Sequence, residues 1–433
     1  MFRHAGKYAT AAGLLLATPL LVRLYTINPY LGLAPETYSA TLTSHALARA
    51  HTIYLDEYFP HGQIPDDLAY AFPRRDGHIV SYEPLASPAT FAPFFLRYRA
   101  RAQWAGRLVW IGNHVAAEIA AGIVVLLGVW LLTLVHPTRA VLVAAIVALA
   151  TSHRTINGAG LWTHTAAALW LVAGLFLWSH ARRRPLVYYP AATTALGLAT
   201  LCRASLLPAA ALAVIDAWRA TAPRRLPAAA SAIAVTLVGT LALGVNWVVH
   251  GSLLGGRAEI VSGISTTHAV SSYFQFSPVH LLGLLVSPSR GMLVYTPVVL
   301  CALPGLVRSL RGQEAEPMRL IALAGIAIFV LHGFIATWWG GWVFGPRYMT
   351  DLLPFIALWL ALSPLPRRGR GLAIGTFTAT LLWSFGVQQL GTMTYPCSWN
   401  RTPVSVDQAH ERLWDWHDTQ LRRCLARLRP QRG

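Results

Sequence analysis

Eight stretches of about 17 or more predominantly apolar residues recur along this chain, and each is long enough to cross a bilayer as a helix. They lie at approximately 8–24, 115–135, 161–178, 228–249, 291–307, 320–337, 347–363 and 371–390. Three weaker candidates, interrupted by small residues, Arg203 or Pro208, lie at about 139–151, 186–202 and 204–218. Only helices and closed barrels satisfy their backbone polar groups inside a membrane. We therefore predict an all-α integral membrane protein with about 11 transmembrane helices, in a range of about 10–13.

The composition agrees with this prediction and excludes a soluble globular protein. Of the 433 residues, 55% are apolar and only 12% are charged, whereas charged residues make up about 25% of typical soluble domains. The net charge is +18, yet Lys7 is the only lysine. A P-loop needs a lysine that reaches phosphate and a Schiff-base enzyme needs a buried one, so neither chemistry is expected. Because the arginines are dispersed between apolar runs, no nucleic acid partner is expected either.

The arginine clusters alternate from one predicted connection to the next, which indicates a topology. Cytoplasmic connections of membrane proteins are enriched in Lys and Arg. With the N-terminus inside, the clusters at 139, 182–184, 219–225, 308–311 and 367–370 all fall inside. Segments 25–107, 250–290 and 338–346 and the tail 391–433 then lie outside. The Ala- and Arg-rich composition suggests a GC-rich bacterial genome, so we predict a multi-pass protein of the bacterial inner (plasma) membrane with a cytoplasmic N-terminus and a periplasmic C-terminus.

The first outer segment, residues 25–107, is the most unusual connection. Seven of the 17 acidic residues are crowded into it: Glu36, Asp56, Glu57, Asp66, Asp67, Asp76 and Glu83. Connections longer than about 15 residues are usually functional or disordered. This one is rich in Tyr, Phe, Leu and Pro, which disfavours disorder. We expect it to form short amphipathic helices on the outer membrane face, with 39–51 as the best candidate and Asp76-Gly77 as a turn.

Three acidic residues of this segment are candidates for a general base. Tyr54-Leu55-Asp56-Glu57-Tyr58 places two carboxylates between aromatic residues, and a carboxylate near the membrane surface can take a proton from a hydroxyl. The alternative is that Asp56 and Glu57 are solvated loop acids or cap a helix. Glu36 competes with them because it directly follows the first predicted span.

Two later outer connections supply the opposite charge. Ser287-Pro288-Ser289-Arg290-Gly291 stands where a helix should begin, and backbone N–H groups with an arginine fork suit a phosphate. Trp338-Trp339-Gly340-Gly341-Trp342 leads into Phe344-Gly345-Pro346-Arg347-Tyr348 at another outer boundary. The alternative is that these tryptophans are interfacial anchors and that Arg347 snorkels to the surface. Together the three segments predict an outward-facing cavity with a base and a phosphate site.

The runs 285–297 and 338–348 resemble those of bacterial GT-C-type membrane glycosyltransferases that use polyprenyl-phosphate sugars and are related to the protein O-mannosyltransferase superfamily. Residues 54–58 and 76–84 are similar to the first external loop of these enzymes, and the resemblance covers roughly residues 8–390. It departs from the family pattern at Glu36, where many relatives have aspartate, and at Glu83, where many have a lysine.

The resemblance implies a GT-C-like transmembrane catalytic domain at 1–390, followed by a periplasmic C-terminal tail at 391–433. It implies a hexosyl or pentosyl transferase that passes a sugar from a polyprenyl-phosphate carrier to an acceptor hydroxyl on the periplasmic face, with inversion. The donor and a glycan, lipid or protein acceptor are the expected partners, within membrane lipids. The roles it implies are catalytic for Asp56, Glu57 and Glu36; phosphate-binding for Arg290, Arg347, Ser287 and Ser289; and cavity-lining for Tyr82, Trp339 and Tyr348.

A metal is not required by this scheme, because two arginines are available to hold the phosphate. The outer histidines leave a divalent metal possible, but their spacings match no zinc signature: His45, His51, His61 and His78. The rival function is a multi-span secondary transporter or lipid flippase without transferase activity. No convincing internal repeat supports it, although Glu118 in a predicted span suits a polar path.

The sequence leaves several properties open. Cys397 and Cys424 both lie in the tail, and an oxidising compartment would allow them to pair, but the sequence does not show whether they approach. The sugar, the acceptor, the length of the carrier and the oligomeric state are also left open, as is activity itself, given the departures from the family pattern.

Overall fold

A computed structural model describes residues 2–428 except 29, 33, 60–61, 67, 99–104, 223–224, 253–274 and 365–370. Asp67, His61 and the arginines at 224, 367, 368 and 370 lie outside the described residues. The chain folds into two compact units, each assembled from separate stretches of sequence. Unit 1 contains Met1–Leu31, Ala117–Ala159 and Phe276–Gly433, and unit 2 contains Gly32–Ala116 and Gly160–Gln275. The tail 391–433 is therefore a part of unit 1.

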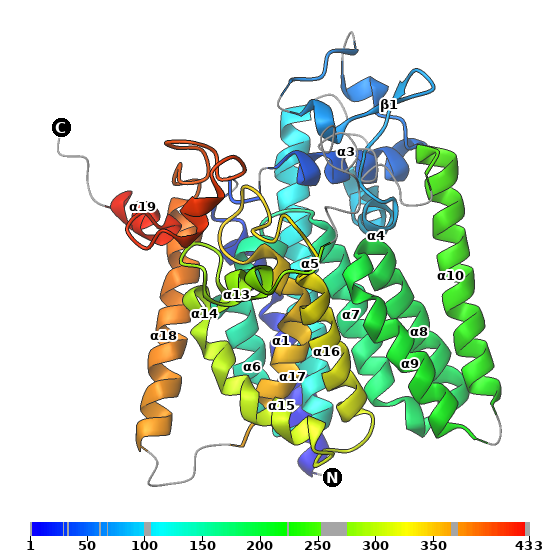
Figure 1. The fold of residues 1–433 in the computed structure, drawn as a ribbon. Helices are drawn as coiled ribbons and strands as arrows, with labels where there is room; N and C mark the ends of the chain where they lie inside the picture. Colours follow the sequence, from blue (N-terminus) through cyan, green and yellow to red (C-terminus); the bar gives the residue numbers. More distant parts are fainter. Residues whose placement is uncertain are drawn as a thin grey trace. The chain divides into compact units, whose positions relative to one another are not determined.

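The regular elements of unit 1 are helices joined by loops, and several helices are broken into short consecutive pieces (Figure 1). Its elements are α1 Phe2–Leu16, α2 Thr18–Tyr25, α6 Pro137–Ala150, η5 His153–Asn157, α13 Pro278–Val286, α14 Met292–Tyr295, η8 Pro297–Ala302, α15 Leu303–Leu310, α16 Met318–His332, η9 Arg347–Leu352, α17 Leu353–Leu362, α18 Gly371–Thr394, η10 His410–Trp414 and α19 Gln420–Ala426. Helix α5, Ala105–Leu134, begins in unit 2 and ends in unit 1. In the tail, α19 packs against α18.

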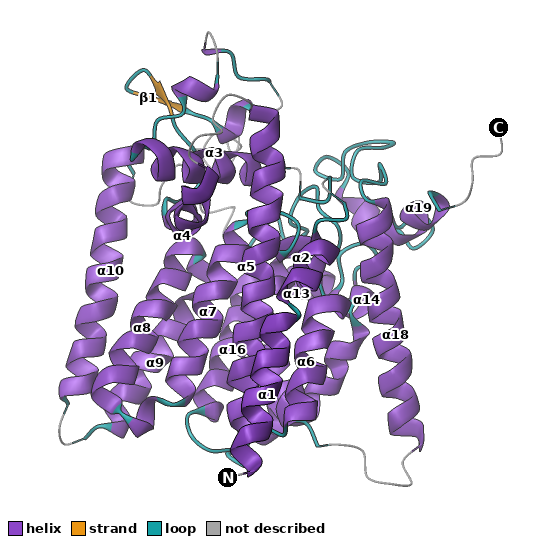
Figure 2. Ribbon diagram, turned by 180° about the vertical axis from the view of Figure 1, so that it is seen from behind, coloured by secondary structure: helices purple, strands orange, loops and turns teal. Residues whose placement is uncertain are grey.

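Unit 2 combines an up-and-down group of helices with the folded first outer segment. Its elements are α3 Pro35–Ala50, η1 Asp56–Tyr58, η3 Ala69–Ala71, β1 Arg74–Arg75, β2 His78–Ile79, α4 Ala86–Phe95, η4 Leu96–Tyr98, α7 Thr163–Ser179, η6 Ala181–Arg183, α8 Pro185–Cys202, η7 Ala204–Leu206, α9 Leu207–Ala220 and α10 Leu226–His250. Helices α7 to α10 stand side by side, α3 lies across one end of them, and the β1–β2 hairpin lies beyond α3 (Figures 1 and 2).

The opposite end of this helix group carries the arginines that the sequence predicts to face inward. Arg182 donates to the buried carboxylate of Asp216 at 3.0 Å, and Asp216 also accepts from Trp178 at 2.9 Å and Tyr189 at 2.8 Å. The buried charge is thus fully compensated, as a stable buried ion requires. Within unit 2, basic residues and the first outer segment therefore lie at opposite helix ends, which agrees with the alternation of charge.

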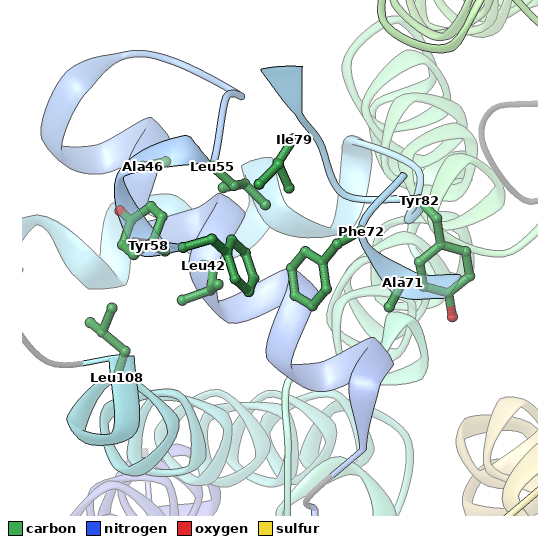
Figure 3. Packing of buried hydrophobic residues seen from close by; sticks show 10 residues of the cluster. Leu42, Ala46, Leu55, Tyr58, Ala71, Phe72, Ile79, Tyr82 and Leu108 are labelled. Atoms are coloured by element: carbon green, nitrogen blue, oxygen red, sulfur yellow. The ribbon is translucent and has the colours of Figure 1, made fainter. Parts of the chain in front are cut away.

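The first outer segment is ordered around its own apolar core. Figure 3 shows Leu42, Tyr58, Phe72 and Ile79 packed together, with Leu108 of α5 on one side. The predicted turn is confirmed: Asp76 and Gly77 have φ of 50° and 84° and connect the antiparallel strands β1 and β2. Helix α3 corresponds to the helix expected at 39–51. It buries polar side chains on several faces because its Ser and Thr hydroxyls, such as Thr41 and Ser44, donate to carbonyls one turn earlier.

The count of about eleven spans is not confirmed. Within the part of the chain that the structure describes, three helices are long and apolar enough to cross a membrane: Gly6–Tyr25, Arg107–Leu134 and Leu226–His250. Others are apolar but shorter. In one of them prolines divide the run: the predicted span 291–307 becomes α14, η8 and α15, with Pro297 and Pro304 at the breaks. A proline lacks the N–H that continues a helix, and a hydropathy pattern does not register that interruption.

Cys397 and Cys424, whose pairing the sequence leaves open, form a disulfide in the tail. It closes a loop with a sequence separation of 27 residues, and a loop of that size is worth about 3–4 kcal/mol in the chain-entropy description. We expect a Cys397→Ser/Cys424→Ser variant to lose protection of the tail, because only noncovalent contacts then hold it. Limited proteolysis checks this: cleavage confined to residues 395–428 should accelerate, and unchanged cleavage would contradict the clamp.

Candidate functional site

Asp56 is held by the β2 strand rather than left free. His78 Nδ1 lies 3.0 Å from Oδ2, and the Ile79 amide donates to Oδ1 at 3.1 Å. The Tyr54 ring stacks on the His78 ring with centroids 4.2 Å apart. Partial burial opposes ionisation, but these two hydrogen bonds outweigh it and hold the pKa of the Asp56 carboxyl below its usual value. A lowered pKa makes a carboxylate a weaker general base.

The same contacts predict how the hairpin responds to acid. Because the folded pKa of Asp56 is depressed, its stabilisation is present above the unfolded pKa of about 3.9 and is lost as pH falls through the folded value. We expect the hairpin to stay protected above about pH 4 and to loosen below it, and Asp56→Asn to loosen it at neutral pH. Hydrogen exchange at the Ile79 amide, corrected for intrinsic rates, measures both effects; equal protection in wild type and variant would contradict them.

Glu57 is also engaged. Its Oε2 accepts from Arg49 Nη1 at 2.5 Å, and both side chains are more than one-third exposed. An arginine bound this closely forms a charge-assisted hydrogen bond and occupies one of the two carboxylate oxygens. The geometry of Glu57 therefore fits an ion pair that fastens η1 to α3 better than it fits a proton acceptor.

Glu36 has a different environment at the start of α3. Tyr70 Oη donates to its Oε2 at a long 3.4 Å, and the Tyr70 ring meets the Tyr82 ring edge-on at 6.0 Å. The structure thus connects an acid of α3 to Tyr70 of η3, and Tyr70 in turn to the predicted cavity residue Tyr82, which follows β2. Hydroxyl-bearing rings beside a carboxylate suit the binding of a polyhydroxylated substrate.

Arg290 has five N–H groups, and all five point at protein acceptors. The side chain is only 1% exposed. Its acceptors are neutral oxygens: Trp339 O at 2.9 Å, Ser289 O at 2.8 Å, Gln420 Oε1 at 3.1 Å, Gly341 O at 3.0 Å and Asn400 Oδ1 at 2.7 Å. In this conformation the guanidinium offers no donor to a phosphate, and its contacts instead join the two predicted phosphate loops to the tail.

The serines of the first loop are used in the same way. Ser287 Oγ donates to the Leu413 carbonyl at 2.6 Å and accepts from the Arg290 amide at 3.2 Å. Ser289 Oγ accepts from the backbone N–H of Gln420 at 3.1 Å. These hydroxyl, amide and carbonyl groups form a buried layer between the loop 287–291 and the tail.

The tryptophan loop, residues 338–345, is packed against the tail along its length. Trp339 Nε1 donates to Asp407 Oδ1 at 2.7 Å, and its ring lies 4.3 Å from that of His410. Trp338 meets Trp414 with ring centroids 5.9 Å apart. The predicted cavity residue Trp339 is therefore covered by the tail in this structure.

Gln420 is the centre of this network, and sequence reasoning missed it. Its Oε1 accepts from Arg290, from Tyr295 Oη at 2.9 Å and from the Gly345 amide at 2.9 Å, and its Nε2 donates to Val343 O at 2.8 Å. No motif surrounds residue 420, so the sequence carries no local signal for this role.

Arg347 begins η9 and is buried, with Nη1 at 3.4 Å from the Gly340 carbonyl. Tyr348 lies beside His332, with ring centroids 5.9 Å apart. His332 Nε2 in turn faces Asp351 Oδ2 at 3.3 Å, both fully buried. Segment η9 also packs against η5, which contains a second buried arginine, Arg154, that the sequence analysis did not single out. The available signal was a polar stretch, 151–157, between two apolar runs.

The acids and the arginines fall into different units: Glu36, Asp56, Glu57 and Tyr82 belong to unit 2, and Arg290, Arg347 and Tyr348 belong to unit 1. Each group is brought together within its own unit, and the convergence of the two groups on one cavity stays a prediction. In the part of the chain that the structure describes, no group of three or more His, Cys, Asp or Glu residues is arranged to hold a metal ion.

Comparison with known proteins places the fold. No family model and no curated protein matches this sequence. Among solved structures, the crystal structure of the Archaeoglobus fulgidus oligosaccharyltransferase in its apo form is similar, with a TM-score of 0.50 and 12% sequence identity over 95% of this chain and 60% of that one. The chain therefore spans about 60% of the length of that enzyme. At this identity the likeness shows the fold alone: the protein has the GT-C-like membrane fold that the sequence motifs imply.

Proposed function

We propose that the protein is a GT-C-type membrane glycosyltransferase that moves a sugar from a polyprenyl-phosphate carrier to an acceptor hydroxyl on the outer membrane face. The observation that carries the proposal is the fold shared with an oligosaccharyltransferase over 95% of the chain. The sequence motifs at 285–297 and 338–348 support the same class. A carrier with a single phosphate and a hexosyl or pentosyl sugar is the donor that these motifs favour.

Glu36 is the base that we favour among the three candidates, because of its place in the sequence and its contact with Tyr70. Asp56 is held by His78 and the Ile79 amide, and Glu57 is held by Arg49, so both are committed to the folded segment. Glu36 accepts from the Tyr70 hydroxyl, whose ring meets that of Tyr82, and it follows the first membrane helix in sequence. It also occupies the place where many members of the resembling family have an aspartate.

The charge account of the reaction is direct. The base takes the proton of the acceptor hydroxyl while its oxygen attacks the anomeric carbon, the bond to the carrier phosphate breaks, and the phosphate leaves with increasing negative charge. One displacement inverts the anomeric configuration. Arginines in a partly desolvated site stabilise the developing charge more strongly than they do in water.

The disulfide between Cys397 and Cys424 supports an outer location for the tail, because disulfides persist in oxidising compartments such as the bacterial periplasm. It agrees with the predicted inner-membrane topology, in which the tail and the first outer segment share one side. The acceptor, whether glycan, lipid or protein, then meets the donor outside the cytoplasm.

The test is a transfer assay with purified full-length protein in lipid nanodiscs. Polyprenyl-phosphate sugars that carry labelled hexose or pentose are incubated with glycan, lipid and peptide acceptor fractions. Label on an acceptor with inverted configuration supports the proposal. Movement of the labelled lipid between leaflets without transfer, measured in proteoliposomes, would replace it with the flippase function.

A further inference from the structure

Arg154 has a buried guanidinium that the protein leaves almost without acceptors. The residue lies in η5, directly after α6, and its side chain is 3% exposed. Among the described residues, its hydrogen bonding is limited to one contact, from Nη2 to the Leu24 carbonyl at 3.5 Å, which is beyond the usual range for an N–H donor. Nε is buried without an acceptor, and no carboxylate in the described part of the chain forms an ion pair with it.

Arg290, another buried arginine of the same unit, has a different environment, because its N–H groups are paired with protein oxygens. Both belong to unit 1, both are nearly inaccessible, and Arg290 satisfies all five N–H groups with protein oxygens. A buried charge without partners is strongly destabilising. An anion that binds such a guanidinium supplies the missing acceptors, so its binding is expected to stabilise the protein.

The segment around Arg154 is fixed by bonds that do not involve the arginine itself. His153 Nε2 donates to the Ala120 carbonyl at 3.0 Å, and Thr155 Oγ1 donates to Gln388 Oε1 at 2.8 Å. His153 Nδ1 accepts from Asn157 Nδ2 at 3.1 Å. The backbone of η5 is thus positioned while the guanidinium keeps its donors, which is the arrangement expected of a preformed binding group.

The location of Arg154 suits a lipid-linked anion. Its carbonyl contact, Leu24, is near the end of α2, and the adjacent Tyr25 Oη donates to the Ala148 carbonyl at 3.2 Å. Arg154 therefore lies where α2 and α6 end, at the predicted outer membrane boundary. Segment η5 packs directly against η9, whose first residue is Arg347.

We propose that Arg154, with Arg347 on the neighbouring segment, binds the phosphate group of a polyprenyl phosphate. The inference deepens the proposed function and rests on it for the identity of the carrier. Guanidinium forks match phosphate oxygens in pairs, and two of them on adjacent short helices neutralise a phosphate that enters from the lipid side. In this arrangement Arg290 holds the loops 287–291 and 338–345 to the tail, and Arg154 takes the role of phosphate ligand that the sequence analysis gives to Arg290.

The proposal makes a prediction that a structural role for Arg154 does not. Arg154→Met keeps an unbranched apolar stem like that of arginine and removes an uncompensated charge, so the empty protein should be as stable as wild type or more stable. Its affinity for polyprenyl phosphate should fall about tenfold or more, the loss expected for a charged hydrogen bond to an anion. Arg139→Gln is the matched control, since Arg139 stands at the other end of α6 and donates to the Ala361 carbonyl.

The experiment uses the full chain in nanodiscs of neutral lipid and measures thermal unfolding and binding of polyprenyl monophosphate, phosphatidic acid and inorganic phosphate. The proposal is supported if polyprenyl monophosphate binds wild type more tightly, and stabilises it more, than phosphatidic acid or inorganic phosphate does. Arg154→Met should then lose this binding and stabilisation while its unfolding temperature without ligand does not fall. Arg139→Gln should bind polyprenyl monophosphate as wild type does. Equal affinity in Arg154→Met, or destabilisation of the empty variant, overturns the assignment. Preference for phosphatidic acid or inorganic phosphate overturns the carrier identity.

Failure of the inference and failure of the proposed function give different results. Arg154-dependent binding of polyprenyl phosphate without transfer of label in the assay above supports the phosphate site and contradicts the enzyme. Transfer of label that is the same in Arg154→Met and wild type supports the enzyme and overturns the role of Arg154.

Discussion

Glu36→Gln is expected to reduce sugar transfer by about 100- to 10,000-fold, the range that a positioned general base contributes. The amide keeps the size of the side chain and can still accept from Tyr70, so the fold of the first outer segment should persist. Because the substitution removes only the ability to take a proton, the fall should appear in kcat, with the KM for the donor little changed. Initial rates with labelled donor, at saturating and limiting concentrations, separate the two.

The matched controls are Asp56→Asn and Glu57→Gln, which test the two acids of the η1 segment. We expect them to retain transfer within about tenfold, the effect of a moderately perturbed segment, because their carboxylates are bound to His78 and Arg49 rather than directed at a substrate. Loss of transfer in Asp56→Asn with normal transfer in Glu36→Gln would move the base to Asp56. If all three variants transfer normally, none of them is the base.

Arg290→Ala should destabilise the outer part of unit 1 by about 3–5 kcal/mol, the cost of breaking a buried charged network. The substitution removes one donor from each of five oxygens, including the carbonyls of Trp339 and Gly341 and the side-chain oxygen of Gln420. Arg290→Lys should recover little, since an ammonium group has three donors and no planar fork. Thermal unfolding in detergent and proteolysis of the tail measure the effect.

Arg422→Ala is the control for this prediction, because Arg422 is exposed on the same tail and donates to the His417 carbonyl. It should change stability by less than about 0.5 kcal/mol, as exposed substitutions usually do. If the tail of Arg290→Ala stays stable and the variant loses only its affinity for phosphate, the structural role of Arg290 is contradicted. Arg290 is then a phosphate ligand, as the sequence predicts. The opposite responses expected of Arg290 and Arg154 make the pair a sharp test of which arginine is structural.

The sequence was sufficient for the membrane character and the helical class, because transfer of apolar surface into lipid depends on composition within a window. It was not sufficient for the number of spans. Pro297 and Pro304 interrupt a run that remains apolar throughout, and hydropathy does not measure helix continuity. The ordered core of the first outer segment was expected from its aromatic content, but the β1–β2 hairpin was recognised only as a turn.

The candidate site shows a more general limit. A Ser- and Gly-rich loop with an arginine looks the same in sequence whether the acceptors are phosphate oxygens or backbone carbonyls. For Arg290 they are carbonyls and amides, and four of the five lie 49 to 130 residues away. Asp56 likewise acquires its partner His78 through a hairpin 22 residues along the chain. Identity and spacing thus predicted candidate residues, and only the tertiary contacts separated arginines whose donors are occupied from those whose donors are not.

The dependence of the outer loops on Gln420 has a consequence for biogenesis. During synthesis, the loops 287–291 and 338–345 leave the translocation machinery long before residues 400–424, which complete their hydrogen bonds, have been made. The hydrogen bonds of these loops therefore stay incomplete until residues 400–424 have been synthesised and an oxidant has joined Cys397 to Cys424. A premature stop codon just before residue 400 should for this reason be as harmful as one that removes a membrane helix.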